Sequence, residues 1–159
     1  MDFLKSVGAI LVLLSGICLG AFLNRAAEHR LVQIEAFVHL LGFLRMQVEC
    51  FALPIGEILA RTDPRILFEC GWHPNAPPRS LSELWEQVRI LDGESERILF
   101  QWSASFGRGY REEEVRISDG AEKQLKKRAE SLRHGLEGKR RVNLTLCVAG
   151  ATAFVILLV

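Results

Sequence analysis

The sequence has no charged residue in residues 6–24 and none in residues 142–159, because every charge except those of Asp2 and Lys5 lies within residues 25–141. A helix rises 1.5 Å per residue, so the first run spans roughly 28 Å, close to the hydrocarbon thickness of about 30 Å of a bilayer. Such runs disfavour both a freely soluble globular protein and a disordered one. The sequence predicts an N-terminal transmembrane anchor (1–24), a charged middle domain (25–141) and a C-terminal transmembrane helix (142–159).

The sequence also has little that would support catalysis. Its four cysteines form no Cys-x-x-Cys pair, and the net charge of +1 gives no case for a nucleic-acid partner. Cys70 and His73 offer two metal ligands, but no second pair follows them. The residues of a run such as Glu112, Glu113 and Glu114 point about 100° apart on a helix, which fits an acidic helix start better than an ion site. We therefore expect no catalytic residue, no metal, no cofactor and no enzymatic activity.

The first apolar run is an uncleaved anchor rather than a signal peptide. It exceeds the usual 7–15 apolar residues of a signal peptide, and no small-x-small cleavage site follows it. Orientation follows from flanking positive charge. Lys5 is alone on one side, whereas the inner flanks of the two runs carry Arg25, Arg30, Lys123, Lys126, Lys127, Arg128, Arg133, Lys139, Arg140 and Arg141. We expect the middle domain to be cytoplasmic, with both chain ends across the membrane.

The middle domain has the pattern of a short helical bundle, and no alternating stretch predicts a sheet. One apolar stripe with helical spacing predicts a long helix from Ala26 onward: Leu31, Ile34, Val38, Leu41, Leu44, Val48 and Phe51. Short helices are expected at 55–61 and 65–70, followed by a proline-rich loop at 71–79. A capping box at Ser80 and Glu83 starts a helix to about Leu91, and another runs from Asp92 to near Phe106. After a turn at 107–109, a last helix continues into the second span. The predicted fold class is all-α.

Small residues within the two runs suggest close helix packing, because two membrane helices approach each other most closely at glycine or alanine. Gly16 and Gly20 form a Gly-x-x-x-Gly pattern, and Ala149 and Ala153 form a weaker version. These pairs could join the two spans or join copies of the chain. Lys139, Arg140 and Arg141 border the second run, where they would attract anionic lipid headgroups.

The order of several segments resembles the stage III sporulation protein AB family over essentially the whole chain. The similarity rests on Lys-x-x-Gly-Ala-Ile-Leu-Val-Leu-Leu-Ser-Gly-x-x-Leu-Gly from Lys5, Leu-Pro-Ile-Gly-Glu-Ile-Leu from Leu53, Leu-Trp-Glu-Gln from Leu84, and Phe-Gly at Phe106. The chain departs from the family at Tyr110 and Glu114, where members commonly carry Asp and Gln.

This resemblance implies a component of the channel between mother cell and forespore in endospore-forming bacteria, located in the mother-cell membrane. The family is similar to the platform proteins of type II secretion and type IV pilus systems, which are thought to couple a cytoplasmic ATPase to the membrane machinery. The implied partners are other membrane proteins of the channel, the ATPase stage III sporulation protein AA, and the lipid bilayer.

We expect a non-enzymatic scaffold that docks its partners through a turn and a basic helix face. The candidate docking residues are Phe106, Gly107, Arg108, Tyr110, Arg111, Lys126, Lys127 and Arg128. Two alternatives stay open. A membrane enzyme or transporter would need polar groups buried among its helices, and a small two-span sensor would need a ligand cavity in the bundle.

Overall fold

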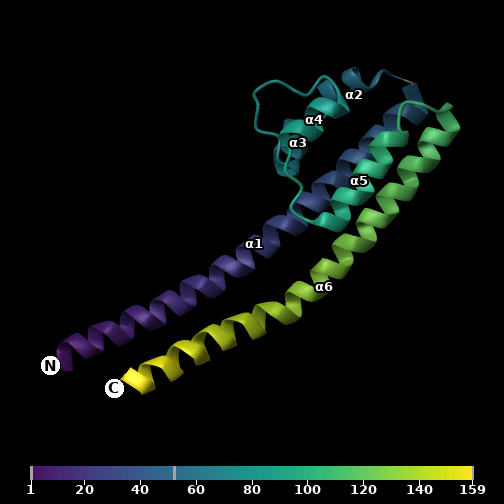
Figure 1. The fold of residues 1–159 in the computed structure, drawn as a ribbon. Helices are drawn as coiled ribbons and strands as arrows, with labels where there is room; N and C mark the ends of the chain where they lie inside the picture. The colour runs from purple at the N-terminus through teal and green to yellow at the C-terminus, as the bar shows by residue number, and fades with distance from the viewer. Residues whose placement is uncertain (1, 52, 159) are drawn as a thin grey trace. The chain divides into compact units, whose positions relative to one another are not determined.

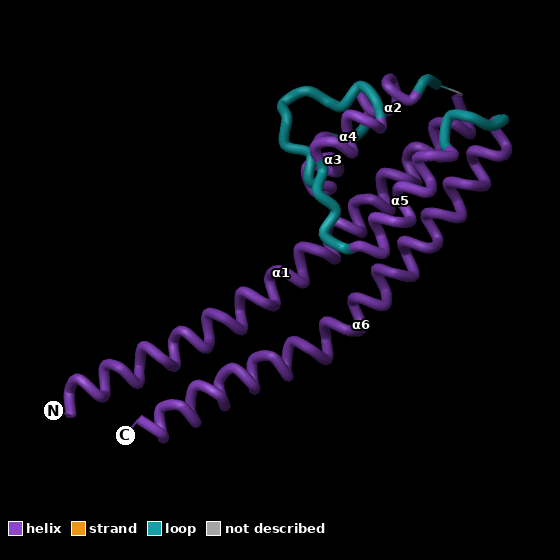
Figure 2. Tube along the Cα trace, in the orientation of Figure 1, coloured by secondary structure: helices purple, strands orange, loops and turns teal. Residues whose placement is uncertain are grey.

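The computed structural model describes residues 2–51 and 53–158 (Figures 1 and 2), although the side chains of 2–7, 9–13 and much of 137–158 lie outside the description. Within these ranges the chain forms helices and no strand, which confirms the all-α prediction. The helices are α1 (Asp2–Phe51), α2 (Ile55–Arg61), α3 (Pro64–Cys70), α4 (Leu81–Gln87), α5 (Gly93–Ser105) and α6 (Arg111–Leu158).

The chain divides into two compact units. Unit 1 consists of Met1–His29 and Leu132–Val159, and unit 2 consists of Arg30–Ser131. The two long helices, α1 and α6, each contribute a segment to both units. The predicted domain limits at 24/25 and 141/142 remain predictions.

Unit 2 has a hydrophobic core to which every one of its helices contributes. The stripe predicted on α1 is buried from Ile34 to Val48, whereas Phe51, its last member, is 64% exposed. Phe51 ends α1, and an apolar residue in a helical pattern is covered only where another element packs against it. The other helices contribute the buried side chains of Ile58, Leu59, Leu67, Cys70, Leu84, Ile98, Leu99, Trp102, Ala121 and Leu125.

A buried glutamine on α1 joins three segments of unit 2. Gln33 Nε2 donates to the carbonyl oxygens of Cys70 (2.8 Å) and Arg89 (2.9 Å), and Gln33 Oε1 accepts from the N–H of Leu91 (2.9 Å). These bonds tie the non-helical residues 89–91 to α1, because Gln33 supplies partners that a further helical turn would have supplied. The prediction that α4 continues to about Leu91 is therefore wrong, and Val88 is its C-cap.

Side-chain caps begin α3, α4 and α5, and the cap at Ser80 confirms the predicted start of α4. Ser80 Oγ accepts from the N–H of Glu83 (3.2 Å), and a Glu83 carboxylate oxygen accepts from the N–H of Arg79 (2.7 Å). Asp63 accepts from the N–H of Arg65 at the start of α3, and Asp92 caps α5. Each cap satisfies a backbone donor that has no partner inside the helix, which fixes where that helix starts.

Unit 1 carries exposed apolar side chains on segments without charge. On α1 these are Leu14, Ile17, Leu19, Phe22 and Leu23, and on α6 they are Val142 and Leu146. A water-soluble surface rarely gathers so many large apolar side chains without polar neighbours.

One helix of the described chain, α1 within Leu14–Phe51, is long and apolar enough to cross a membrane, with mean hydropathy 1.3. Core helices of soluble proteins and signal sequences can be equally long and apolar. Within this range the segment of residues 31–48 carries two charged residues, Glu35 and Arg45, and half of its residues are buried. It is therefore the core segment of unit 2. The predicted spans at 6–24 and 142–159 remain predictions.

Candidate functional site

The turn between α5 and α6 is an exposed, well-defined loop. The aromatic rings of Phe106 and Trp102 lie 4.7 Å apart, which fixes the start of the turn on the core. Gly107 has φ +81°, a left-handed conformation that favours glycine, so the chain reverses at this residue. Tyr110 follows with 88% of its surface exposed. Arg108 and Arg111 are exposed on either side of it. The structure thus brings the predicted turn residues together on one surface.

The predicted basic face of α6 separates into residues with different roles. Arg128 donates from Nε (3.1 Å) and Nη2 (2.8 Å) to the carboxylate of Asp92, and its Nη1 lies 2.8 Å from Glu94 Oε2. Lys126 Nζ lies 2.6 Å from Glu122 Oε1. Lys127 is exposed and has no ion pair within the described residues. Docking by these three residues remains a prediction, but Arg128 already serves the attachment of α5 to α6.

A second ion-pair cluster lies between α1 and α6, and the sequence analysis did not predict it. Arg45 lies 3.4 Å from Asp119 Oδ1 and 3.3 Å from Glu122 Oε2. Lys123 Nζ lies 2.7 Å from Asp119 Oδ2, and the hydrogen bond from Lys123 lowers the pKa of Asp119. Because Arg45 bridges two carboxylates one helical turn apart on α6, this cluster fixes the register between α1 and α6 in unit 2.

The predicted helix-packing residues have different surroundings within unit 1. Gly20 is buried and Gly16 is half-buried, although most of their neighbours are exposed. Ala149 and Ala153 are exposed. Close packing at these residues remains a prediction. The side chains of Lys139, Arg140 and Arg141 lie outside the described residues, so the lipid contact assigned to them also remains a prediction.

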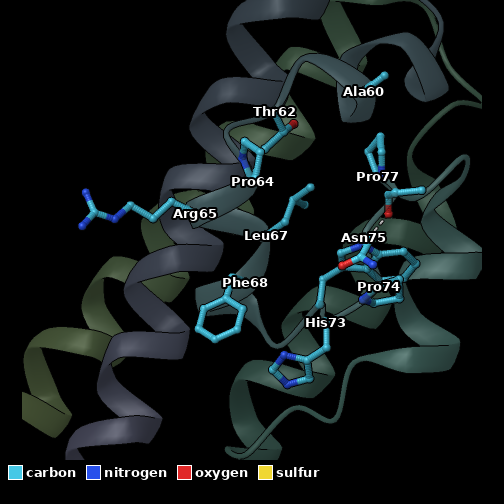
Figure 3. A pocket seen from close by; sticks show the side chains of 12 residues that line it. Ala60, Thr62, Pro64, Arg65, Leu67, Phe68, His73, Pro74, Asn75 and Pro77 are labelled. Atoms are coloured by element: carbon cyan, nitrogen blue, oxygen red, sulfur yellow. Dashed lines mark hydrogen bonds between the residues drawn. The ribbon is translucent and has the colours of Figure 1, made fainter.

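A cleft of about 500 Å³ lies between α2, α3 and the loop at 71–77 (Figure 3). Its walls are largely apolar and include Leu67, Phe68 and Pro77. The rings of Phe68 and His73 meet edge to face at 5.2 Å. In Figure 3 the side chain of Arg65 extends away from the prolines on the opposite wall, so the cleft has no charged group aimed into it. The polar groups therefore do not converge as a ligand site would require.

The potential metal ligands and nucleophiles do not form a reactive site in the described part of the chain. No group of three or more His, Cys, Asp or Glu residues there is placed to hold a metal ion. Cys70 is buried, and burial raises the pKa of its thiol, which keeps it protonated and unreactive. His73 is exposed on the loop. The pair therefore fits a buried thiol beside a surface histidine.

The sequence did not predict Phe51 as a surface residue, because its spacing places it on the buried stripe of α1. The end of α1 and the α5–α6 turn lie at the same end of unit 2 (Figure 1), so Phe51 and Tyr110 expose aromatic surface at that end. Only the tertiary arrangement distinguishes Phe51 from its buried neighbours.

No protein-family model, curated protein or solved structure matches this chain.

Proposed function

We propose that this chain is a non-enzymatic scaffold that is anchored in a membrane by both parts of unit 1 and that docks partner proteins through unit 2. The observation that carries the proposal is the distribution of apolar surface. On the uncharged segments of unit 1 the described large apolar side chains are exposed, whereas unit 2 exposes only some of its large apolar side chains and fills a core with the others. Lipid is the solvent in which an apolar exposed surface is stable.

Docking is the role that the surface of unit 2 supports best. Its described residues gather no metal ligands, and its cleft has no convergent polar groups. The α5–α6 turn instead exposes tyrosine and arginine, two of the residue types that contribute most to protein–protein binding. A bundle tied to the membrane at both ends would hold such a surface in a limited range of orientations.

The resemblance to the stage III sporulation protein AB family supports a finer proposal. In that case the scaffold belongs to the channel between mother cell and forespore, lies in the mother-cell membrane with unit 2 in the cytoplasm, and docks stage III sporulation protein AA. The small-residue pairs of unit 1 would then serve contacts with neighbouring membrane proteins or with a second copy.

Topology reporters test the anchoring. Alkaline phosphatase is active only outside the cytoplasm and green fluorescent protein folds best inside it, so each is fused at the N-terminus, within the exposed loop near Asn75, and at the C-terminus of the full chain. We expect fluorescence from the loop fusion and phosphatase activity from the two terminal fusions. Phosphatase activity in the loop fusion would contradict the cytoplasmic placement of unit 2.

Copurification of the ATPase with the detergent-solubilised full chain tests the finer proposal. The variant Lys127→Glu reverses an exposed charge that has no ion pair within the described residues, whereas a reversal at Arg128 would also break the contact with Asp92. We expect Lys127→Glu to reduce ATPase recovery while the helical content stays unchanged. If the same amount of ATPase copurifies with both chains, this face of α6 does not dock it. If no ATPase copurifies with the unaltered chain, the ATPase is not the partner.

A further inference from the structure

We infer that Gly16 and Gly20 pack α1 against α6 of the same chain, so that the two segments of unit 1 lie in the membrane as one closed helical hairpin. The inference rests on the proposed membrane anchoring and names the partner of the glycine pair. It narrows the role given to the small residues of unit 1, because it leaves Ala149 and Ala153 for contacts with a neighbouring membrane protein or a second copy.

One side of α1 is covered within unit 1. From residue 14 to residue 29, the residues that are not exposed are Gly16, Gly20, Asn24, Ala26 and Ala27. All of them except Ala26 follow one another at intervals of four, four and three residues, which places them on one side of the helix. Leu19 and Phe22 are 56% and 69% exposed, so these large side chains lie on the other sides.

The burial of Gly20 is not a general property of glycine on this helix. Gly20 is buried, whereas Gly8 on the same helix is exposed, and no described atom lies within 4 Å of the position that a Cβ of Gly8 would take. The residues one helical turn from Gly8 are larger than those one turn from Gly20. The neighbouring side chains of α1 therefore do not explain the burial of Gly20, and another segment of unit 1 lies over it.

That segment is α6, which supplies the other part of unit 1 and is also covered on one side. Between residues 132 and 153, the described residues that are not exposed are Leu132, Gly135, Leu136 and Cys147. At 100° per residue, all of these except Gly135 point within about 60° of one another. In a unit built from two helical segments, the covered side of each segment faces the other segment. Ala149 and Ala153 are exposed and lie outside this contact.

The composition of the covered side of α1 suits a helix better than lipid. Glycine lets two backbones approach closely, and the resulting van der Waals contact favours association between membrane helices. The half-buried Asn24 lies on the same side, and a polar side chain is less costly against a helix than against lipid. A second copy that used Gly16 and Gly20 would first have to displace α6 of the same chain. The glycine pair is therefore assigned to the contact within one chain.

Helix geometry selects the residue of α6 that lies opposite Gly20. Arg45 of α1 contacts Glu122 of α6 in unit 2, where the two helices run in opposite directions. Gly20 precedes Arg45 by 25 residues, and Cys147 follows Glu122 by 25 residues. Both helices are continuous over these stretches and rise equally per residue, so Gly20 is expected level with Cys147. Cys147 is one of the covered residues of α6.

Disulfide formation between Cys147 and a cysteine introduced on α1 tests the inference. The full chain carries Cys18→Ser and Cys50→Ser, and it keeps the buried, unreactive Cys70. One version carries Gly20→Cys. Its matched control carries Phe22→Cys, two residues away on the opposite side of α1.

The location of each disulfide is read from a single cleavage. A protease recognition sequence is inserted in the exposed loop near Asn75, between α1 and α6. Membranes from cells are oxidised mildly, solubilised and treated with the protease, and the products are separated on a denaturing gel without reductant. A disulfide within one chain keeps its two halves together, whereas a disulfide between copies gives a product of higher mass.

We expect Gly20→Cys to link the two halves of one chain at about ten times the yield of Phe22→Cys or more, because a disulfide requires Cα atoms within about 7 Å of each other. Disulfides mainly between copies would show that the glycine side faces a second copy. Equal yields from the two positions would show that α6 has no preferred side of α1. Either result would overturn the inference.

A second pair of cysteines leaves the glycines unchanged, in case Gly20→Cys disturbs folding. Asn24→Cys and Asn143→Cys each lie four residues from the first pair, in the direction of unit 2, and this chain also carries Cys147→Ser. The tryptophan fluorescence of unit 2 should match that of the unaltered chain in every version. Absence of a disulfide within the chain from both pairs would overturn the inference.

Carbonate extraction of the same membranes separates this inference from the proposed anchoring. A chain that forms the disulfide within one molecule but is extracted by carbonate would keep the contact between the glycine pair and α6 and contradict the anchoring. A carbonate-resistant chain without this disulfide would keep the anchoring and contradict the hairpin.

Discussion

Phe22 and Phe37 lie on the same helix, α1, but their side chains have opposite surroundings. Phe22, in unit 1, is 69% exposed, whereas Phe37, in unit 2, is completely buried. Phe22 lies in the uncharged run of residues 6–24, whereas Phe37 lies in a segment of α1 that carries Arg30, Glu35 and Arg45. The comparison teaches that hydrophobicity alone does not place a residue in a core. The distribution of charge around the helix decides which side the apolar residues face.

The largest expected difference between the units comes from shortening these two phenylalanines. Phe37→Ala removes a side chain that packs against Trp85 with ring centroids 5.8 Å apart, and leaves a cavity. We expect a loss of about 3–5 kcal/mol in the free energy of unfolding. Phe22→Ala should change it by less than about 0.5 kcal/mol, because it leaves no cavity.

Tryptophan fluorescence during urea unfolding of the detergent-solubilised chain measures both effects. All three tryptophans, Trp72, Trp85 and Trp102, belong to unit 2, so the signal reports the unfolding of that unit. Equal losses in the two variants would mean that both phenylalanines belong to one core, which would contradict the contrast between the units.

The second prediction exchanges one exposed apolar residue in each unit for arginine. Leu19 is 56% exposed and Val32 is 44% exposed, so the two positions differ mainly in the unit to which they belong. If unit 1 lies in lipid, Leu19→Arg should cost about 2.5–3.5 kcal/mol of membrane insertion. Val32→Arg should leave insertion unchanged. The carbonate-resistant share of the chain in membrane fractions measures both, and equal behaviour would argue against a lipid environment for unit 1.

Local sequence patterns predicted the parts of the fold that depend on neighbouring residues. The bounds of α2 were predicted as observed, and the start of α4 follows from the Ser80 cap. These features depend on backbone groups within one helical turn of the residue that satisfies them. The sequence next to a helix end therefore shows directly which residue can cap it.

The features that join distant segments could not be predicted in this way. Gln33 satisfies backbone groups of Cys70, Arg89 and Leu91, and Arg128 pairs with Asp92. The spacing of these residues in the sequence does not show which polar side chains will form hydrogen bonds or ion pairs with one another. The same holds for the exposure of Phe51, because its spacing is that of a buried residue. The turn at 107–109 was predicted from its composition, whereas its geometry depends on the contact of Phe106 with Trp102.

The third prediction concerns the polar centre of unit 2, a feature without a counterpart in the described part of unit 1. Gln33→Leu keeps most of the volume but leaves the N–H of Leu91 and two carbonyl oxygens without their partner. We expect a loss of about 1–3 kcal/mol in unfolding free energy, since buried donors and acceptors are costly when unsatisfied. Amide hydrogen exchange at Leu91 should accelerate locally.

The exposed glutamine Gln101 supplies the matched control, because Gln101→Leu removes no hydrogen bond between segments of unit 2. If Gln33→Leu and Gln101→Leu have the same stability and the same exchange at Leu91, the link formed by Gln33 does not hold the α4–α5 connection.

The smallest expected effect depends on pH and concerns the attachment of α5 to α6. Hydrogen bonds from Arg128 lower the pKa of Asp92 from 3.8 to about 2. Because the folded state binds this proton more weakly than the unfolded state, the contribution of Asp92 to stability is complete above pH 3.8 and disappears as the pH falls toward 2.

Asp92→Asn keeps a residue that caps helices well but removes the charge. We expect it to cost about 1 kcal/mol at pH 6. The thermal unfolding temperatures of the unaltered chain and of Asp92→Asn should differ progressively less as the pH falls from 4 to 2. When both chains also carry Arg128→Gln, the difference between their unfolding temperatures should no longer depend on pH. A difference that is constant across this pH range would show that Asp92 acts through its cap alone, and that the two helices of unit 2 are joined without help from its charge.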